Sequence, residues 1–483
     1  MFELSFALKY LIPKRKQLST SLIAFLSIVV ISLVIWLLLL FLSLTEGMER
    51  AWLKKLTALH GSLRVHPTEA YFHSYYYLID KYASGSDYTL KTIAQKKATL
   101  SPDPYDITLD AELPQNFPEP VRKKDGSLLD PVKELYAVLD AFPSQVEGFC
   151  FQEVTLGGAL MHLNASQGDV YQATYVATIP EKSRQFVAMI EEGAIDTTST
   201  TPPRILLPKS MKENGATVGS SGTLSYSAWT AGSFQEQRLP FVVSGFYNPG
   251  LLPIGNRAAL VPQEVISLIH ATASSFQMNP READGVVIWC DTPQDVEYAK
   301  KTILNELRKR GIESYWTVTS FRDYPFAKEV LQQFQSDKLL FTLIGIVILM
   351  MAMSNIISLL LFLVHDKKRE IGILTAMGAS KRSISLIFAF AGTMIGSIGS
   401  LMGIAATSLT LHFIHPIVDS LRFLQANNAF QLEMFSGSYP TQLSGDALLL
   451  VLILTPILSC LAALIPAWKA SHVQPFHTLK TTL

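Results

Sequence analysis

Charged side chains are missing from four long stretches of this chain, which has 483 residues and a formal net charge of zero. Each stretch is at least as long as the ~20 apolar residues that a helix needs to cross a bilayer. The charge-free stretches are residues 18–44, 339–364, 383–411 and 447–467. The mean hydropathy of +0.26 is too apolar for an ordinary soluble enzyme and too polar for a chain lying wholly in a membrane. The sequence therefore predicts an α-helical membrane protein with four transmembrane helices and a large α+β domain, residues 45–337, between the first two.

The usual catalytic motifs are also missing. The chain has no Gly-x-x-x-x-Gly-Lys-[Ser/Thr] loop to hold nucleotide phosphates, no His-Glu-x-x-His and no Gly-x-Ser-x-Gly. No carboxylate lies inside a predicted span, which argues against a proton-coupled transporter and against an intramembrane aspartyl protease. We therefore expect that the chain is not an enzyme and binds no metal or cofactor, so any ATP must be bound by another subunit.

Cysteine is scarce, with three residues in the whole chain. Cys460 lies in the fourth predicted span, and Cys150 and Cys290 lie in the domain between the first two spans. Two cysteines so far apart do not make a disulfide framework, and the sequence leaves open whether they are bridged. The zero net charge gives no indication of a nucleic-acid partner.

The basic residues next to the spans predict the orientation of the chain, because Lys and Arg in short flanking loops resist translocation. They cluster before the first span, between the second and third, and after the fourth. These residues are Lys9, Lys14, Arg15, Lys16, Lys367, Lys368, Arg369, Lys381, Arg382, Lys469 and Lys480. The loop 412–446 contains one basic residue, Arg422. Both termini and the loop 365–382 are thus predicted to be cytoplasmic, and the domain 45–337 and the loop 412–446 to lie outside.

The two ends of the chain are short cytoplasmic segments in this topology. In residues 1–17, Phe2, Phe6 and Tyr10 are spaced by four residues, so this segment is predicted to form a helix that lies in the membrane interface. The alternative is a frayed apolar terminus. Residues 468–483 form the predicted cytoplasmic tail after the fourth span.

The external domain contains recognisable strands and helices near its end. Residues 285–290 read as a strand, a helix begins at Pro293 and ends before Gly311, and residues 312–318 supply the next strand. A strand at 258–261 followed by a helix at 262–276 repeats this order. Further strands are predicted at 204–208, 222–228 and 239–247. This pattern predicts a layered α+β domain.

Three other segments of the domain stand out. Residues 66–130 are rich in proline and are predicted to be an irregular surface insertion. Residues 229–238 read as a hairpin tip that carries Trp229 and Phe234, and such aromatics either bind a partner or fold back onto the sheet. Residues 321–337 have helical character and continue into the second span.

The loop 365–382, His-Asp-Lys-Lys-Arg-Glu-Ile-Gly-Ile-Leu-Thr-Ala-Met-Gly-Ala-Ser-Lys-Arg, separates the second and third spans. It has room for about two turns of helix. Gly378 can adopt the left-handed conformation that ends a helix, and Ser380 can cap the next one. The alternative is a solvated basic loop, but charge explains Lys367 to Arg369 and not the Gly-Ala-Ser joint. The pattern predicts a stiff cytoplasmic elbow on which a soluble motor can push.

The third span contains two successive Gly-x-x-x-Gly patterns, which permit close packing of helices. The glycines are Gly392, Gly396, Gly399 and Gly403. The pattern leaves open whether the contact lies within one subunit or across a dimer, and we expect the former.

Several segments resemble one family of membrane proteins. They are Asn355-Ile-Ile-Ser, Val364 to Ser380, Pro466 to Pro475, Leu42 to Glu49 and Phe241 to Tyr247. In these segments the chain resembles ABC transporter permeases of the MacB/FtsX superfamily, most closely the LolC/LolE-type lipoprotein-releasing permeases. The resemblance implies a MacB-like periplasmic core for residues 45–337 and a multi-pass protein in the bacterial inner membrane, in contact with membrane lipids.

The resemblance also implies partners and a mechanism. A cytoplasmic LolD-like ATPase dimer, which binds ATP and Mg, would push on the loop 365–382, and a second permease copy or a paralogue would complete the complex. The implied coupling residues are Lys368, Arg369, Glu370, Ile371, Leu374, Met377, Gly378 and Ser380. By position, Trp229, Phe234 and Arg238 resemble the contact for a LolA-like periplasmic carrier that accepts lipoprotein substrates. The alternatives within the superfamily are an FtsX-like regulator of a cell-wall hydrolase and a MacB-like efflux permease.

Overall fold

The computed structural model describes residues 18–142, 148–166, 168–195, 200–230, 233–250, 255–272, 284–290, 293–425 and 442–472. The chain forms two compact units, and each is described by itself. The described residues of the membrane unit are 18–51, 330–425 and 442–472, and those of the α/β unit lie between 52 and 329. The predicted N-terminal helix 1–17, most of the tail and much of the loop 412–446 lie outside the described residues.

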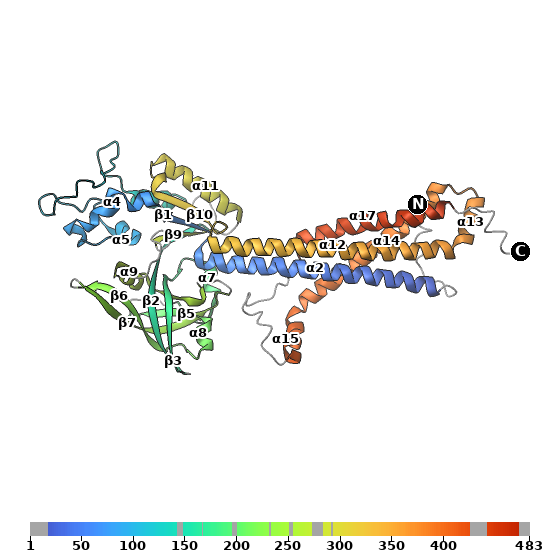
Figure 1. Cartoon of the computed structure of the whole chain (residues 1–483), viewed down its shortest axis with the longest axis horizontal. Coiled ribbons are helices and arrows are strands. Elements are labelled where there is room, and N and C mark those ends of the chain that lie inside the picture. Colours follow the sequence, from blue (N-terminus) through green and yellow to red (C-terminus); the bar gives the residue numbers. More distant parts are fainter. Residues whose placement is uncertain are drawn as a thin grey trace. The chain divides into compact units, whose positions relative to one another are not determined.

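Four helices of the described chain are long and apolar enough to cross a membrane, as the charge-free stretches predicted. They are α2 (Leu18–His60), α12 (Pro325–Asp366), α14 (Lys381–His412) and α17 (Gly445–Ser471). All four are longer than the predicted spans, and α2 and α12 are much longer (Figure 1). The first continues past residue 44 because Trp52 and Leu56, one turn apart, are buried, and it ends where Gly61 takes a positive φ of 79°. As predicted for residues 321–337, helix α12 starts well before its apolar stretch, with proline at its first position.

Helix α14 contacts both α17 and α2 within the membrane unit. A Cβ atom added to Gly392 would come within 2.4 Å of Ala463 Cβ on α17, and one on Gly396 within 2.3 Å of Ser459 Oγ. On the other side, added Cβ atoms at Gly399 and Gly403 would approach α2 within 2.8 Å of Ile31 Cγ2 and 2.7 Å of Ile35 Cγ2. The four glycines therefore let α14 pack closely against two helices of its own chain, not against a second copy.

The first part of the α/β unit is an antiparallel sheet in the order β10-β1-β9-β2. Its strands are β10 (Trp316–Ser320), β1 (Leu63–Pro67), β9 (Asp284–Trp289) and β2 (Cys150–Ala165). Helix α11 (Pro293–Lys309) connects β9 and β10, so the predicted strand-helix-strand unit is confirmed. The last strand begins later than predicted, because residues 313–315 form a 3₁₀ helix. Strands β1 and β2 were not predicted.

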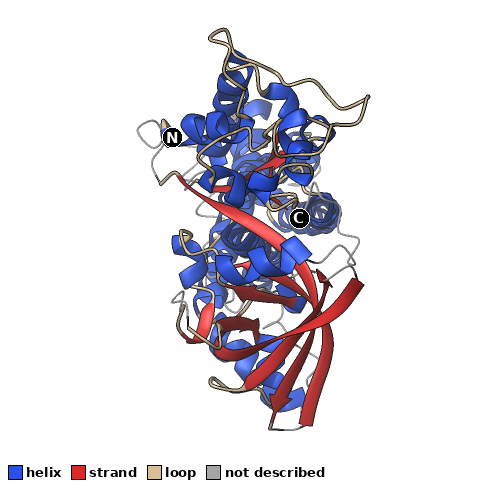
Figure 2. Ribbon diagram, turned by 90° about the vertical axis from the view of Figure 1, so that its left-hand side faces the viewer, coloured by secondary structure: helices blue, strands red, loops and turns tan. Residues whose placement is uncertain are grey.

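The second part is a closed ring of six strands, β2-β3-β8-β5-β7-β6, in which β6 pairs again with β2 (Figure 2). The additional strands are β3 (Gly168–Thr178), β8 (Ala258–Val261), β5 (Arg204–Pro208), β7 (Ser233–Tyr247) and β6 (Ser221–Thr230). Ring closure removes exposed strand edges, and the interior is filled by side chains such as Leu224, Phe241 and Ile269. The predicted strands at 204–208, 222–228, 239–247 and 258–261 are all present.

Strand β2 belongs to both parts of the α/β unit. Residues 150–155 pair with β9, and residues 156–165 pair with β3. The short strand β4 (Ile190–Gly193) pairs with β7. The short helices that follow or precede the strands are α6 (Pro131–Asp140), α7 (Arg184–Val187), α8 (Lys209–Glu213) and α9 (Gln263–Thr272). Cys150 and Cys290 carry thiols, and no disulfide forms among the described residues.

The segment 66–130 is more ordered than predicted. Its first two residues still belong to β1, and three short helices follow, α3 (Glu69–Phe72), α4 (Tyr75–Leu78) and α5 (Ile93–Ala98). They enclose an ion pair between Lys96 Nζ and Asp80 Oδ2, 2.5 Å apart and almost inaccessible to solvent. Burial lowers the pKa of Lys96 from its usual value. Residues 99–130, between α5 and α6, consist mainly of turns and irregular chain, so the prediction of an irregular segment is correct for this part.

Because Gly392 and Ala463 leave no room for a methyl group, we expect that Gly392→Ala forces α14 and α17 apart. The expected loss is about 1–3 kcal/mol of unfolding free energy, typical of overpacked sites. Thermal unfolding of the purified full chain in detergent measures it. Gly445→Ala is the matched control, because a Cβ atom at that helical glycine meets open space. Equal melting temperatures for the two variants would show that the close contact is not needed.

Candidate functional site

The predicted elbow is a short helix at one end of the membrane unit, α13 (Lys368–Ala376), between α12 and α14 (Figure 1). Lys367 is the single residue between α12 and α13. Backbone hydrogen bonds continue across it, since its N–H donates to Leu363 O at 2.9 Å and the Ile371 N–H donates to its carbonyl at 2.9 Å. The chain therefore bends at Lys367 without a flexible break.

The second joint of the elbow has the cap geometry that Gly-Ala-Ser predicted. Gly378 has a φ of +95°, and its N–H donates to Thr375 O at 3.1 Å, while the Ala379 N–H donates to Leu374 O at 3.0 Å. This pair of bonds is a Schellman motif, which satisfies the last carbonyls of α13. Ser380 Oγ then accepts a hydrogen bond from the Ser383 N–H at 3.1 Å and caps α14.

A buried apolar contact fixes α13 to the bundle, and a local ion pair lies at its first turn. Ile371 is 1% exposed and belongs to the same apolar cluster as Leu363 of α12, Ile384 of α14 and Ala467 of α17. The buried Lys367 places its Nζ 2.8 Å from Glu370 Oε1. A buried anchor, continuous backbone hydrogen bonds at the first joint and a capped second joint thus hold α13 against the helices beside it.

The opposite face of α13 is exposed and partly apolar. Met377 is 79% exposed and Ile373, one turn earlier, is 45% exposed. Lys368, Arg369 and Glu370 are also exposed, so the apolar pair is bordered by charge. Exposed apolar side chains with a charged rim are typical of a surface that contacts another protein.

The predicted coupling residues thus divide into two groups. Lys368, Arg369, Glu370, Met377, Gly378 and Ser380 are exposed, whereas Leu374 is half-buried and Ile371 is buried in the bundle. Ile371 can therefore act as an anchor but not as a contact. Sequence reasoning missed Ile373, although its four-residue spacing from Met377 on a two-turn helix was a usable signal.

The sequence did not predict a second set of polar contacts, which lies near the residues where α2 and α12 leave the membrane unit. The Ser444 N–H donates to Ser43 Oγ at 3.1 Å, and its hydroxyl bonds to Glu46 of α2. Lys338 of α12 places its Nζ 4.0 Å from Glu46 Oε2 and 3.9 Å from Asp446 Oδ2. These contacts join α2, α12 and the start of α17.

The residues predicted to contact a carrier belong to the α/β unit. Trp229 of β6 lies opposite Phe234 of β7, and their side chains lie outside the described residues. The hairpin tip is shorter than the predicted 229–238, because strands β6 and β7 remain paired as far as Thr230 and Ser233. Arg238 lies opposite Ser225 in the ladder, with its Nε 3.0 Å from Glu236 Oε1, and is exposed. The hydrogen bond from Arg238 holds the pKa of Glu236 below its usual value.

Among the described residues, no three His, Cys, Asp or Glu side chains lie close enough together to bind a metal ion. What the elbow offers is a stiff surface for protein contact.

Comparison with known proteins places the elbow inside a recognised domain. Residues 342–475 match the family described as FtsX-like permease C-terminal, and this range contains more than half of α12 and all of α13, α14 and α17. The chain is similar to the lipoprotein-releasing system transmembrane protein LolC of Haemophilus influenzae, with 29% identity over 153 residues. That match covers 32% of this chain and 36% of the relative, so it spans about a third of that protein.

Two other relatives extend the comparison. LolC of Xylella fastidiosa (strain 9a5c) is 23% identical over 330 residues, which cover 65% of this chain and 74% of the relative. The macrolide export ATP-binding/permease protein MacB of Campylobacter jejuni is 22% identical over 171 residues, 35% of this chain and 23% of the relative.

The cap at Gly378 gives a prediction about the elbow itself. A β-branched side chain is strained at a positive φ, so Gly378→Val should loosen the joint at a cost of more than ~1–2 kcal/mol, whereas Gly378→Asn should be tolerated. Trypsin cleavage at Lys381 and Arg382 of the purified full chain measures the loosening, with the asparagine variant as the control. Equal cleavage of the two variants would show that the left-handed cap does not hold the joint.

Proposed function

We propose that the chain is the permease subunit of an ATP-driven ABC complex that releases lipoproteins from the bacterial inner membrane. The match of residues 342–475 to the FtsX-like permease family and the similarity to LolC and MacB proteins support this proposal. In this proposal the complex hands each lipoprotein to a periplasmic carrier. The ATP and its magnesium ion are bound by a separate LolD-like ATPase dimer, because this sequence has no P-loop.

One observation carries the proposal. The elbow presents Ile373 and Met377 to solvent while Ile371 and both helix joints tie it to α12, α14 and α17. A push on its exposed face therefore displaces transmembrane helices and is not absorbed by a loop. The arrangement has the two features that a coupling helix requires, an outward protein-contact face and a rigid attachment.

The orientation of the chain follows from charge. Lys368, Arg369, Lys381 and Arg382 surround the elbow, and basic flanks stay in the cytoplasm. We infer that both termini are cytoplasmic and that the α/β unit is periplasmic. Helix α12, with 42 residues, is ~63 Å long at 1.5 Å per residue, about twice the ~30 Å hydrocarbon core. It therefore extends beyond the bilayer as a continuous helix.

The energetics of the substrate explain why a carrier is needed. A lipoprotein with three acyl chains has roughly 45 CH₂ groups, and at ~0.8 kcal/mol each their transfer to water would cost on the order of 35 kcal/mol. Release into water is excluded by this cost, so the chains must pass directly into an apolar cavity of the acceptor. The β6–β7 hairpin with Trp229, Phe234 and Arg238 is the proposed docking point for this LolA-like carrier.

Depletion of the protein tests the proposed substrate. We expect lipoproteins destined for the outer membrane to remain in the inner membrane, as measured by membrane fractionation. In a reconstituted complex, an acylated lipoprotein should stimulate ATP hydrolysis and the same protein without acyl chains should not. Normal sorting during depletion would contradict lipoprotein release. Stimulation that does not depend on acylation would favour a regulator of a cell-wall hydrolase or an efflux permease.

A second experiment tests coupling at the elbow. Met377→Asp places a charge in the proposed contact, so we expect transport by the reconstituted complex to fall at least tenfold, the loss typical of a hot-spot residue. Basal ATPase activity of the separate subunit and insertion of the permease should not change. Leu100→Asp is the matched control, because Leu100 is an apolar residue of the α/β unit with 98% exposure. Unchanged transport by Met377→Asp would remove α13 from the coupling path.

A further inference from the structure

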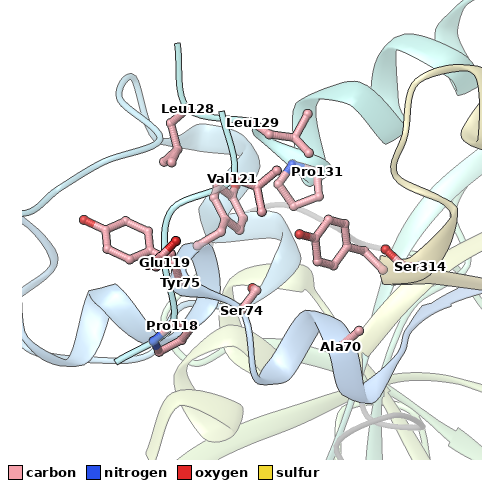
Figure 3. A pocket seen from close by; sticks show the side chains of 12 residues that line it. Ala70, Ser74, Tyr75, Pro118, Glu119, Val121, Leu128, Leu129, Pro131 and Ser314 are labelled. Atoms are coloured by element: carbon pink, nitrogen blue, oxygen red, sulfur yellow. The ribbon is translucent and has the colours of Figure 1, made fainter. Parts of the chain in front are cut away.

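Two surface features of the described chain take no part in the proposed function. The first is a pocket of about 290 Å³ in the α/β unit, beside α3 and α4 (Figure 3). The hydroxyls of its residues Tyr75 and Tyr76 donate to Asp103 Oδ1 at 3.2 Å and to Asp130 Oδ1 at 2.8 Å. Because these groups are engaged within the protein, the pocket does not identify a ligand. The second feature is helix α15 (Ile414–Gln425) of the membrane unit, whose surface and position do indicate a partner.

Helix α15 follows α14 across a bend at one residue, Phe413, whose φ of −99° and ψ of 21° are not helical. Backbone hydrogen bonds continue through the bend, since the Phe413 N–H donates to Leu409 O at 3.1 Å and the Ile417 N–H donates to Phe413 O at 3.2 Å. Pro416 has no N–H to donate to the His412 carbonyl, and a proline ring clashes with the carbonyl four residues earlier. The proline therefore accounts for the bend, and α15 leaves the end of α14 in a new direction (Figure 1).

The length of α14 places this bend at a surface of the bilayer. Its charge-free stretch, residues 383–411, is ~44 Å long at 1.5 Å per residue. A bilayer measures ~40–45 Å with its headgroup layers, so a helix that begins at one surface with Lys381 and Arg382 reaches the other surface near residue 411. Because a single residue separates the two helices, α15 starts in the headgroup layer or directly beside it.

The sequence of α15 is amphipathic. Apolar residues recur at the spacing of one helical face, at positions 414, 417, 418, 421 and 424. By the same spacing, His415, Asp419 and Arg422 fall on the other side, with Phe423 as an apolar exception. With histidine neutral, the charges of Asp419 and Arg422 cancel. Such a helix fits the boundary between acyl chains and headgroups, and it does not require anionic lipids.

The apolar side of α15 is partly open. Ile414 is 7% exposed and Val418 is half-buried, whereas Ile417 is 39% exposed. Phe413, at 48%, and Leu409 of α14, at 62%, precede Ile417 at intervals of four residues. The exposed apolar surface of a transmembrane helix therefore continues across the bend onto α15. Since that surface of α14 meets lipid, lipid is also the occupant that fits the side of α15 with Ile417.

We propose that α15 lies in the interfacial layer of the membrane, with Ile417 against the acyl chains and His415 toward water. In this position α15 anchors the end of α14 at a fixed depth, because lifting the helix would transfer apolar side chains into water. The partner of this surface is lipid of either headgroup charge. The inference rests on insertion of α14 in a membrane and not on the release of lipoproteins.

Fluorescence quenching tests the proposal on the full chain in phosphatidylcholine nanodiscs. The probe is a nitrobenzoxadiazole label on Ile417→Cys, and the matched control carries the same label on His415→Cys. The signal of the labelled unsubstituted chain, which contains three native thiols, is subtracted. We expect a nitroxide on the lipid acyl chain to quench the label at 417 at least three times as strongly as the label at 415. Aqueous iodide should show the opposite preference, by at least the same factor.

The other possible results overturn the assignment. Equal quenching of the two labels by the acyl-chain nitroxide would show that α15 does not lie in the interface. Protection of the label at 417 from both quenchers would show that the protein itself, either the α/β unit or a second copy, covers the apolar side.

Lipid charge separates apolar anchoring from recognition of headgroups. Because the charges of α15 cancel, replacing part of the phosphatidylcholine by phosphatidylglycerol should leave both preferences unchanged. Acyl-chain quenching that appears only with phosphatidylglycerol would overturn the proposal in favour of a site for anionic headgroups. The measurement uses no ATPase and no lipoprotein, so its failure is separate from failure of the proposed function.

Discussion

The turn between α13 and α14 is the constraint on which the membrane unit depends. A helix that reverses direction next to a bilayer leaves carbonyl and amide groups that lipid cannot satisfy. The turn from Gly378 to Ser380 satisfies two of these carbonyls through a Schellman motif and one amide through the side-chain cap of Ser380. Because the turn is so short, the burial of Ile371 is enough to fix α13 against three membrane helices. A longer loop would have left the exposed pair Ile373 and Met377 without a rigid support.

In the proposed mechanism, displacement of the elbow reaches α2 and α17 through α14. Its glycines bring it close to α17 at Ala463 and to α2 at Ile31 and Ile35, so there is little free volume to absorb movement. The hydrogen bond from Trp36 Nε1 to Thr410 Oγ1, 2.9 Å long, adds a polar contact between α2 and α14. Close packing and a polar contact thus join α14 firmly to both α2 and α17.

The sequence predicted the parts of this structure that depend on local chemistry. Absence of charge located the four long helices, and Gly378 and Ser380 located the second elbow joint. The closed ring was not predicted, because β2 pairs with β9 along residues 150–155 and with β3 along 156–165, so no simple alternation marks it as a strand. The compact first part of the segment 66–130 was missed for a similar reason. Its core consists of tyrosines and an Asp80–Lys96 pair, which a sequence pattern does not distinguish from a polar loop.

The membrane helices are held together differently at the elbow and around Lys338. At the elbow, the contacts are buried apolar packing and backbone caps, which do not depend on solvent. The contacts of Lys338 with Glu46 and Asp446 are long and partly exposed, and such pairs contribute only about 0–1 kcal/mol. In the proposed mechanism, a force applied at α13 therefore disturbs the contacts of Lys338 more easily than the packing around α14 or the buried hydrogen bond between Ser444 and Ser43. In the proposed mechanism, movement appears at the weakly held ends of α2 and α12, from which the chain enters the α/β unit.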